Sequence, residues 1–186
     1  MSAPATREAT YEDLLQVPEN LVAEIIRGQL VTHPRPAPRH AVASSSLGIE
    51  LGGPFDKGRG GPGGWWILDE PELHLGSQVL VPDLAGWRRE RMPALPQTAW
   101  FDLAPDWVCE VLSPATARID RVEKLPIYAA AGVCYAWLID PDLRTLEAYQ
   151  DHDGHWLLLA ARENDNPVQF PPFDAITFPL NTLWAD

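Results

Sequence analysis

Two carboxylates lie inside stretches of the chain that are otherwise apolar and strand-like. Asp83 follows Pro82 in the run VLVPDLA, and Glu110 lies within WVCEVL. Burying a lone carboxylate is costly unless it is paired, hydrogen-bonded or bound to a metal. If the two strands are neighbours, these side chains face each other across roughly 5 Å, and they repel unless a cation lies between them. Oxygen ligands of this kind suit Mg²⁺ or Mn²⁺ rather than zinc.

A lysine and two further acids could complete such a site. Asp120 and Lys124 are four residues apart in a predicted helix and therefore share one of its faces. A lysine beside a metal can orient an attacking water or stabilise developing negative charge. Glu24, in LVAEII, is another acid flanked by apolar residues.

Each of these residues also has a purely structural interpretation. Asp83 could cap a turn, because Pro-Asp is a frequent turn pair. Glu110 could form a salt bridge with Arg118 or Arg121, and Glu24 could pair with Arg27. Lys124 could be a solvated helix residue, and Asp120 could pair with it or cap the helix.

The elements that must position these residues can be predicted from periodicity and turn residues. A capping-box pattern at Thr10 predicts a short helix to about Val17. A hairpin around Arg27-Gly28-Gln29 follows, and then a helix over 39–52 with Val42, Ser46, Leu47 and Ile49 on one side.

The remaining strands predict the central sheet. Strands 79–87, 107–112 and 134–140 are expected at its centre, and a helix over 116–131, ending at Gly132, connects the last two. Such a crossover favours parallel pairing. We therefore expect an α+β (α/β) fold with a mixed sheet flanked by helices.

Length and composition favour one domain. The 186 residues fit a single domain spanning 1–186, with residues 1–10 disordered and a core over about 11–160. No apolar run is long enough for a transmembrane helix, and the first residues lack signal-peptide features, so we expect a cytoplasmic protein. Cys109 and Cys134 have no metal or redox spacing and are expected in the core.

A series of motifs in order carries a resemblance. It comprises E-I-I-R-G-Q-L-V, His40 at the start of the next helix, V-P-D, E-V-L-S-P-A-T, D-x-x-x-K-x-x-x-Y and G-V-x-x-Y-A-W-L-I-D-P. Over about residues 10 to 145, the chain resembles the Uma-two family of restriction-endonuclease-like proteins, within the PD-(D/E)XK nuclease superfamily.

The resemblance implies a restriction-endonuclease-like fold and a Mg²⁺- or Mn²⁺-dependent endonuclease, expected to act on DNA and to form a homodimer. It implies that Asp83 and Glu110 are catalytic metal ligands and that Glu24 is a third ligand. The superfamily's lysine would fall at position 112, which is Leu112 here, and the Uma-like pattern implies Lys124 instead. His40 and Asp120 match recurrent positions and are possible accessory residues.

The net charge of −12 departs from the basic face of most DNA binders. From Asp140 onward there are nine acids and two arginines, a net −7, which leaves −5 for the first 139 residues. The cations there form clusters that are candidate nucleic-acid contacts. A nuclease fold retained as a binding or assembly module is the alternative, favoured by the acidic charge and by Leu112. The candidate contacts are Arg35, Arg39, Lys57, Arg59, Arg88 and Arg89.

Overall fold

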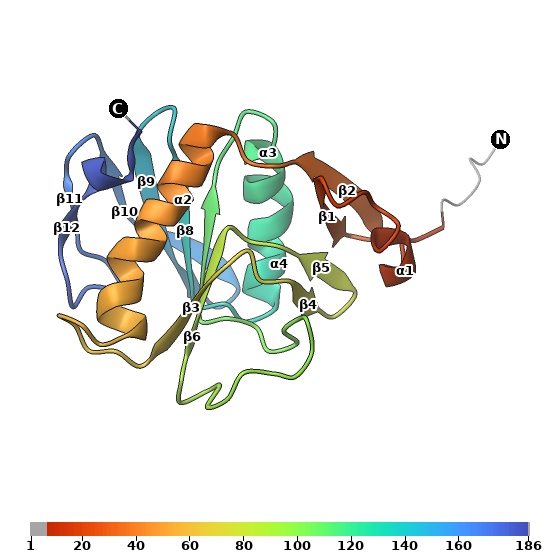
Figure 1. Cartoon of the computed structure of the whole chain (residues 1–186), viewed down its shortest axis with the longest axis horizontal. Helices are drawn as coiled ribbons and strands as arrows, with labels where there is room; N and C mark the ends of the chain where they lie inside the picture. The colour runs from red at the N-terminus through yellow and green to blue at the C-terminus, as the bar shows by residue number, and fades with distance from the viewer. Residues whose placement is uncertain (1–6, 186) are drawn as a thin grey trace.

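The computed structural model describes residues 7–185. A mixed sheet of six strands forms its centre. Its strands are β3 (Trp65–Asp69), β6 (Leu84–Arg88), β7 (Trp107–Val111), β8 (Tyr135–Asp140), β9 (Thr145–His152) and β10 (His155–Glu163). They lie in the order β10-β9-β8-β7-β6-β3 (Figure 1). β7 and β8 are parallel and the other neighbours antiparallel, which confirms the predicted mixed sheet.

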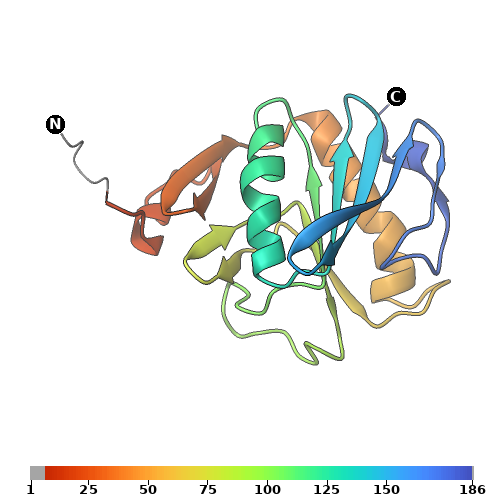
Figure 2. The same ribbon diagram turned by 180° about the vertical axis from the view of Figure 1, so that it is seen from behind.

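Helices cover both faces of this sheet, as Figures 1 and 2 show from opposite sides. On one face lies α2 (Pro38–Leu51), which continues as the π-helix η1 (Gly52–Asp56). On the other lies the helix predicted over 116–131. It consists of α3 (Ala117–Ile119), the π-helical turn η2 (Asp120–Lys124) and α4 (Leu125–Ala130).

The buried side of α2 differs from the predicted one. Ala43, Leu47 and Leu51 are fully buried, at a spacing of four residues, whereas Val42 and Ile49 are 37% and 76% exposed. The prediction is confirmed for Leu47 and wrong for Val42 and Ile49, because α2 rests on the sheet along a narrow row of side chains. Hydrophobicity alone does not select that row.

A smaller, four-stranded sheet joins the N-terminal hairpin to a second hairpin from the middle of the chain. Its strands are β1 (Leu21–Ile26), β2 (Gln29–Pro34), β4 (Leu73–Leu75) and β5 (Gln78–Leu80), in the order β2-β1-β5-β4. Arg27 and Gly28 have φ values of 50° and 74°, as a two-residue turn of type I′ requires. The predicted hairpin is therefore confirmed, as is the capping box of α1 (Tyr11–Leu14) at Thr10.

The strand predicted over 79–87 is two strands in different sheets. β5 ends at Leu80 and β6 begins at Leu84, and residues 81–83 pass between the two sheets. Pro82 cannot donate a hydrogen bond to a neighbouring strand, which accounts for the break. Asp83 consequently lies just before β6, where Leu84 is paired with Cys109 of β7.

The core extends beyond the predicted limit of residue 160. The C-terminal segment contains β11 (Pro167–Val168), β12 (Phe178–Pro179) and the 3₁₀-helix η3 (Leu180–Leu183). The Phe173 ring lies within 5.0 Å, centroid to centroid, of the Phe55, Trp65 and Trp107 rings. These aromatic contacts join the segment to α2 and the large sheet.

Two smaller expectations need correction. Of the segment 1–10 predicted to be disordered, residues 1–6 lie outside the described part. The rest contacts the first hairpin, with the Ala9 amide donating to the Gly28 carbonyl at 2.9 Å. Cys109 is buried as predicted, but Cys134 is exposed, because it lies just before β8. None of the helices within 7–185 is long and apolar enough to cross a membrane.

Close packing around Gly86 in β6 gives a test of this sheet. A Cβ there would lie 3.2 Å from both Ile67 Cδ1 and Trp107 Cε3. We expect Gly86→Ala to lower the free energy of unfolding by about 1–3 kcal/mol through overpacking, measured by urea denaturation. Gly52→Ala is the control, because its Cβ would meet nothing within 4 Å and its φ of −63° suits alanine. Equal stability of the two variants would contradict this packing.

Candidate active site

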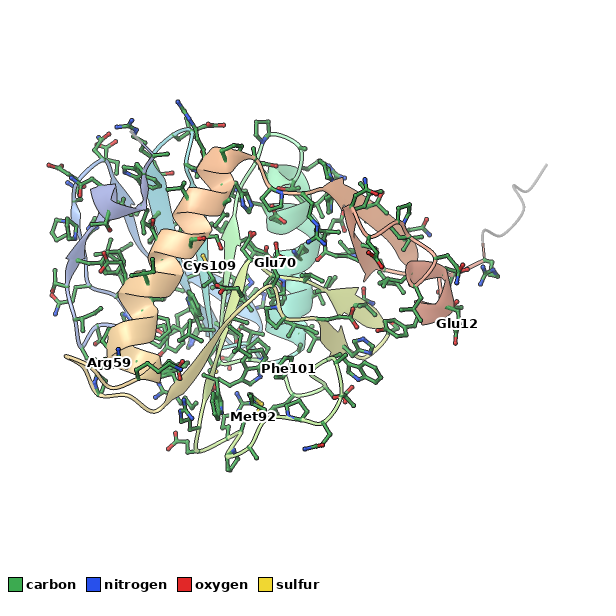
Figure 3. The ribbon with its side chains drawn as sticks, in the orientation of Figure 1. Glu12, Arg59, Glu70, Met92, Phe101 and Cys109 are labelled. Atoms are coloured by element: carbon green, nitrogen blue, oxygen red, sulfur yellow. The ribbon has the colours of Figure 1, made fainter. Side chains whose placement is uncertain are left out.

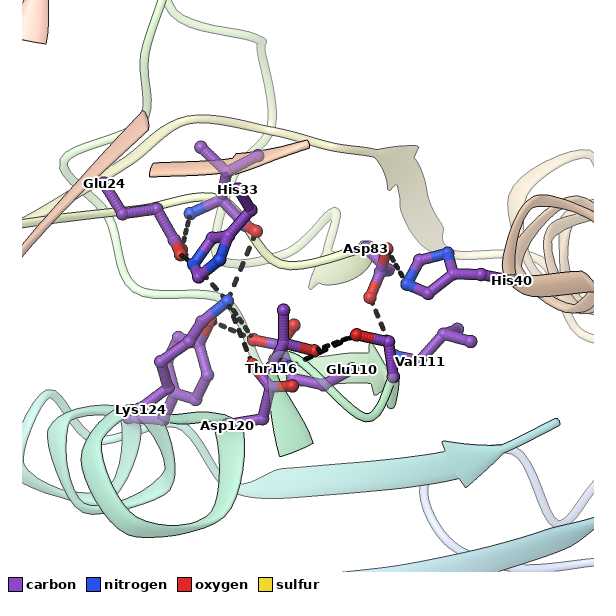
Figure 4. Close-up of polar contacts among 12 residues, drawn as sticks. Glu24, His33, His40, Asp83, Glu110, Val111, Thr116, Asp120 and Lys124 are labelled. Carbon is purple, nitrogen blue, oxygen red and sulfur yellow. Dashed lines mark hydrogen bonds and ion pairs between the residues drawn. The ribbon is translucent and has the colours of Figure 1, made fainter. Parts of the chain in front are cut away.

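The ammonium group of Lys124 lies among buried carboxylates. Its Nζ is 2.8 Å from Glu110 Oε1, 3.0 Å from Glu24 Oε1 and 3.8 Å from Asp120 Oδ1 (Figure 4). Lys124 is only 3% exposed, which excludes the solvated interpretation. The π-helical turn η2 ends at this residue, and the helix lies on the face of the sheet to which Glu110 points.

Glu110 is held from two sides. Its Oε1 accepts a hydrogen bond from the Tyr128 hydroxyl at 2.6 Å, in addition to the contact with Lys124. Tyr128 and Lys124 are separated by one helical turn and therefore reach the same carboxylate. The salt bridges considered for Glu110 do not form, because Arg118 pairs with Glu123 and Arg121 with Glu147.

Glu24 reaches the site from the hairpin of the smaller sheet. Its Oε1 accepts a hydrogen bond from the Val81 amide at 2.8 Å, and its Oε2 lies 3.4 Å from His33 Nε2. The pair with Arg27 is absent, since Arg27 pairs with Glu123. Sequence reasoning missed His33. It included Tyr128 in the motif D-x-x-x-K-x-x-x-Y, four residues after Lys124, but gave the tyrosine no role.

Asp83 lies on the other side of Glu110 from the lysine (Figure 4). Its Oδ2 accepts the Val111 amide at 2.7 Å, and its Oδ1 lies 3.2 Å from His40 Nε2. Asp83 therefore does more than cap a turn: it bridges the end of β7 to the start of α2. The Nδ1 atom of His40 is buried without a hydrogen-bond partner in the described structure.

One cavity of about 360 Å³ joins these groups. Its floor carries the residues predicted from the sequence. One wall comes from Pro34 at the end of β2 and from the β2–α2 connection at 35–37. The other comes from the β7–α3 connection at 113–116. The predicted residues that line it are Glu24, Arg35, His40, Asp83, Glu110, Asp120 and Lys124.

Burial and mutual repulsion set the protonation of the cluster. Burial raises the pKa of Glu110 well above its usual value, and Lys124 only partly opposes this. Burial likewise raises the pKa of Asp120. For Glu24 the effect of burial is outweighed by Lys124, His33 and the Val81 amide, which hold the pKa at about 2. Glu110 and Glu24 outweigh burial at Lys124 and raise the pKa of the ammonium, so the lysine stays charged.

His40 shows the same competition on the α2 side. Burial would lower the pKa of its imidazole, but the hydrogen bond and charge of Asp83 outweigh burial and raise it.

With four carboxylates and one lysine on the floor of a single cavity, the cluster has more potential negative charge than Lys124 can neutralise. A second cation would relieve this imbalance.

The carboxylates of the cavity fit an open Mg²⁺ site better than a site in which protein side chains alone surround the metal. Within residues 7–185, no group of three or more His, Cys, Asp or Glu side chains is arranged to hold a metal. Mg²⁺ does not need such a group, because it retains several waters and is often bound by one or two carboxylates with substrate phosphates. Asp83 and Glu110 line the cavity from adjoining strands and could supply two carboxylates. Both Glu24 oxygens already have partners.

The candidate nucleic-acid contacts do not converge on this cavity. Of the six, only Arg35 lines it. Arg39 pairs with Asp142, and Arg89 and Lys57 both pair with Asp56. Arg88 lies at the opposite end of β6 from Asp83, paired in register with Trp65. Figure 3 shows Arg59 far from Glu70, a residue of the cavity wall.

This mixed sheet, with acids at the ends of adjoining strands and a lysine from the covering helix, defines a restriction-endonuclease-like protein. The chain belongs to the Uma2 family, described as "Putative restriction endonuclease", whose model matches residues 9–181. The resemblance inferred from the sequence is thereby confirmed.

The fold is shared with a solved structure. A crystal structure described as a "putative nuclease" from Anabaena variabilis is similar with a TM-score of 0.74 and 24% identity, covering 94% of this chain and 97% of that one. At this identity the likeness shows the fold alone. No curated protein matches the chain.

Replacing the buried lysine tests the charge balance. We expect Lys124→Met to lower the free energy of unfolding at pH 7 by about 3–5 kcal/mol, because uncompensated carboxylates remain buried. Lys124 lowers the pKa values of Glu24, Glu110 and Asp120. Without it, these pKa values rise in the folded state, which then binds more protons than the unfolded state and gains stability as pH falls.

The deficit relative to wild type should therefore shrink at about pH 4.5, measured by urea denaturation at both pH values. Lys57→Met is the matched control, because the Lys57 side chain is 58% exposed. A deficit that does not change with pH would mean that the variant loses packing alone.

Proposed function

We propose that the chain is a metal-dependent endonuclease that hydrolyses phosphodiester bonds of nucleic acid. The observation that supports this most directly is the buried Lys124–Glu110 pair, at 2.8 Å, on a cavity shared with Asp83 in a member of a nuclease family. The lysine expected at Leu112 would be replaced in function by Lys124. Leu112 itself is buried in the core under α4.

In this proposal Asp83 and Glu110 hold one Mg²⁺ or Mn²⁺ ion. The bound ion would supply positive charge for the phosphate and lower the pKa of a water. Tyr128 fixes the orientation of Glu110, and the Val111 amide and His40 fix Asp83. Glu24 and Asp120 keep the Lys124 ammonium charged and in place. Glu24 as a third metal ligand stays a prediction.

The role of Lys124 follows from its position and charge. Hydrolysis joins a water oxygen to phosphorus, breaks a P–O ester bond and leaves negative charge on the leaving oxygen and the phosphate. A lysine ammonium fixed by surrounding carboxylates is preorganised to donate hydrogen bonds to that charge. Glu110 and Glu24 raise the pKa of Lys124, which favours the role of hydrogen-bond donor over that of base.

Cleavage of supercoiled plasmid and of single-stranded DNA in Mn²⁺, Mg²⁺ or EDTA tests this proposal. We expect nicking only with the metals, and a loss of at least about 100-fold in Asp83→Ala, as for removal of a group that stabilises transition-state charge. Asp165→Ala is the matched control, since Asp165 lies on an exposed turn after β10. Activity that is unchanged in Asp83→Ala would contradict this assignment of the site.

Mn²⁺ binding, measured by calorimetry, separates the proposal from its alternative. If wild type and variant are equally inert and wild type binds no Mn²⁺, the nuclease proposal fails. The fold would then serve as a binding or assembly module, for which the net charge of −12 is the supporting observation. The homodimer stays a prediction, which light scattering of the intact chain would test.

A further inference from the structure

The acids and the lysine lie at the bottom of the cavity, not on an open surface. Glu24, Glu110 and Lys124 are only 2–3% exposed. At the rim, by contrast, the side chains of Arg35 and Glu70 are 57% and 42% exposed. A phosphate that reacts here must therefore enter the cavity and pass the rim.

The cavity has the size of a pocket, not of a groove along a double helix. Its volume is about 360 Å³. The volume falls in the usual range for small-molecule pockets, about 300–1,000 Å³. A duplex is also a stiff rod, so bringing one of its phosphates down to the buried floor would require deforming it at a cost in energy.

The walls are built to stay in place. Pro34 and Pro36 lie on one wall and Pro114 on the other, and each proline restricts its own backbone and that of the preceding residue. Arg35 pairs with Glu70 at 3.5 Å, which joins the β2–α2 connection to the β3–β4 connection. Widening the entrance to admit a duplex would require breaking this pair and moving segments that are conformationally restricted.

The charge around the entrance also disfavours binding of a duplex. Duplex binders neutralise many phosphates with a basic face. Here Arg35 is the one arginine that lines the cavity within the described structure, and Lys57 and Arg89 lie elsewhere, paired with Asp56. The walls instead offer apolar groups, including Val22, Ala37 and Ala115, which can contact the base and sugar of an unpaired nucleotide.

We infer that the cavity admits an unpaired strand of nucleic acid, such as a single-stranded end or a flap, and excludes intact duplex. This inference rests on the proposed nuclease function and specifies its substrate class. The strand enters past Arg35, which contacts its backbone. It reaches Lys124 and the carboxylates one nucleotide at a time.

Three DNA substrates of one sequence, about 20 nucleotides long, test this: single strand, blunt duplex, and duplex with a single-stranded overhang. In Mn²⁺ we expect the single strand and the overhang to be cut at least about ten-fold faster than the duplex, and the overhang only within its unpaired part. Equal or faster cutting inside the blunt duplex would overturn the inference while leaving the nuclease proposal intact.

Binding to wild type in Ca²⁺, measured by fluorescence anisotropy, gives a readout that does not need turnover. We expect the single strand to bind at least about ten-fold more tightly than the duplex. Equal binding of both forms would overturn the inference even if nothing is cleaved. If neither form binds and neither is cleaved, both the inference and the nuclease proposal fail.

Two pairs of variants test whether the strand binds in the cavity. Ala115→Trp fills the space between the walls and should abolish single-strand binding, whereas Ala94→Trp, on an exposed loop away from the cavity, should not. Arg35→Ala should reduce the slope of log affinity against log salt by about 0.7, the loss of one phosphate contact to a single strand. Arg39→Ala, which lies outside the cavity lining, should leave the slope unchanged. Equal effects within either pair would place the strand elsewhere.

Discussion

The arrangement of the site depends on one buried ammonium group. Lys124 joins Glu24 of β1, Glu110 of β7 and the Val81 carbonyl between β5 and β6, so it connects both sheets to the helix that carries it. Burying one such charge is costly, and this cost is offset only if its partners are close and well hydrogen-bonded. Glu24 and Glu110 meet that condition through the Val81 amide and the Tyr128 hydroxyl. A position that costs this much to fill is typical of a functional site.

The break between β5 and β6 is the second requirement. Because Pro82 ends the pairing, the chain leaves the smaller sheet at Leu80 and enters the larger one at Leu84. Within this short crossing, Val81 contacts Glu24 and Lys124 through its backbone, while Asp83 contacts Val111 and His40. A continuous strand, as the sequence predicted, would belong to one sheet, so residues 81–83 could not contact the smaller sheet, β7 and α2 at once.

The sequence was informative where a residue conflicted with its surroundings. Asp83 and Glu110 stand out because a carboxylate in an apolar run needs a partner, and both do lie on one cavity. Lys124 shows no such conflict in a helix with several charged residues, and its burial follows from the π-helical turn and the packing of α4. His33 and the buried row of α2 also depend on tertiary contacts that local patterns do not encode. The basic clusters do not converge on the cavity for the same reason, since charge spacing in sequence does not reveal that Asp56 is the partner of Lys57 and Arg89.

The acidic net charge is compatible with a nuclease site once the site's depth is considered. A protein that binds duplex DNA by its outer surface needs a basic face, and a net charge of −12 opposes this. A protein that admits one strand into a cavity needs positive charge only along the path to the floor. Arg35 at the rim, paired with Glu70, and Lys124 at the floor are the cations on this path. A metal held by Asp83 and Glu110 would add the positive charge that the carboxylates of the floor offset. Acidic surroundings would then weaken non-specific binding of duplex, so that charge and cavity size would select for the same kind of substrate.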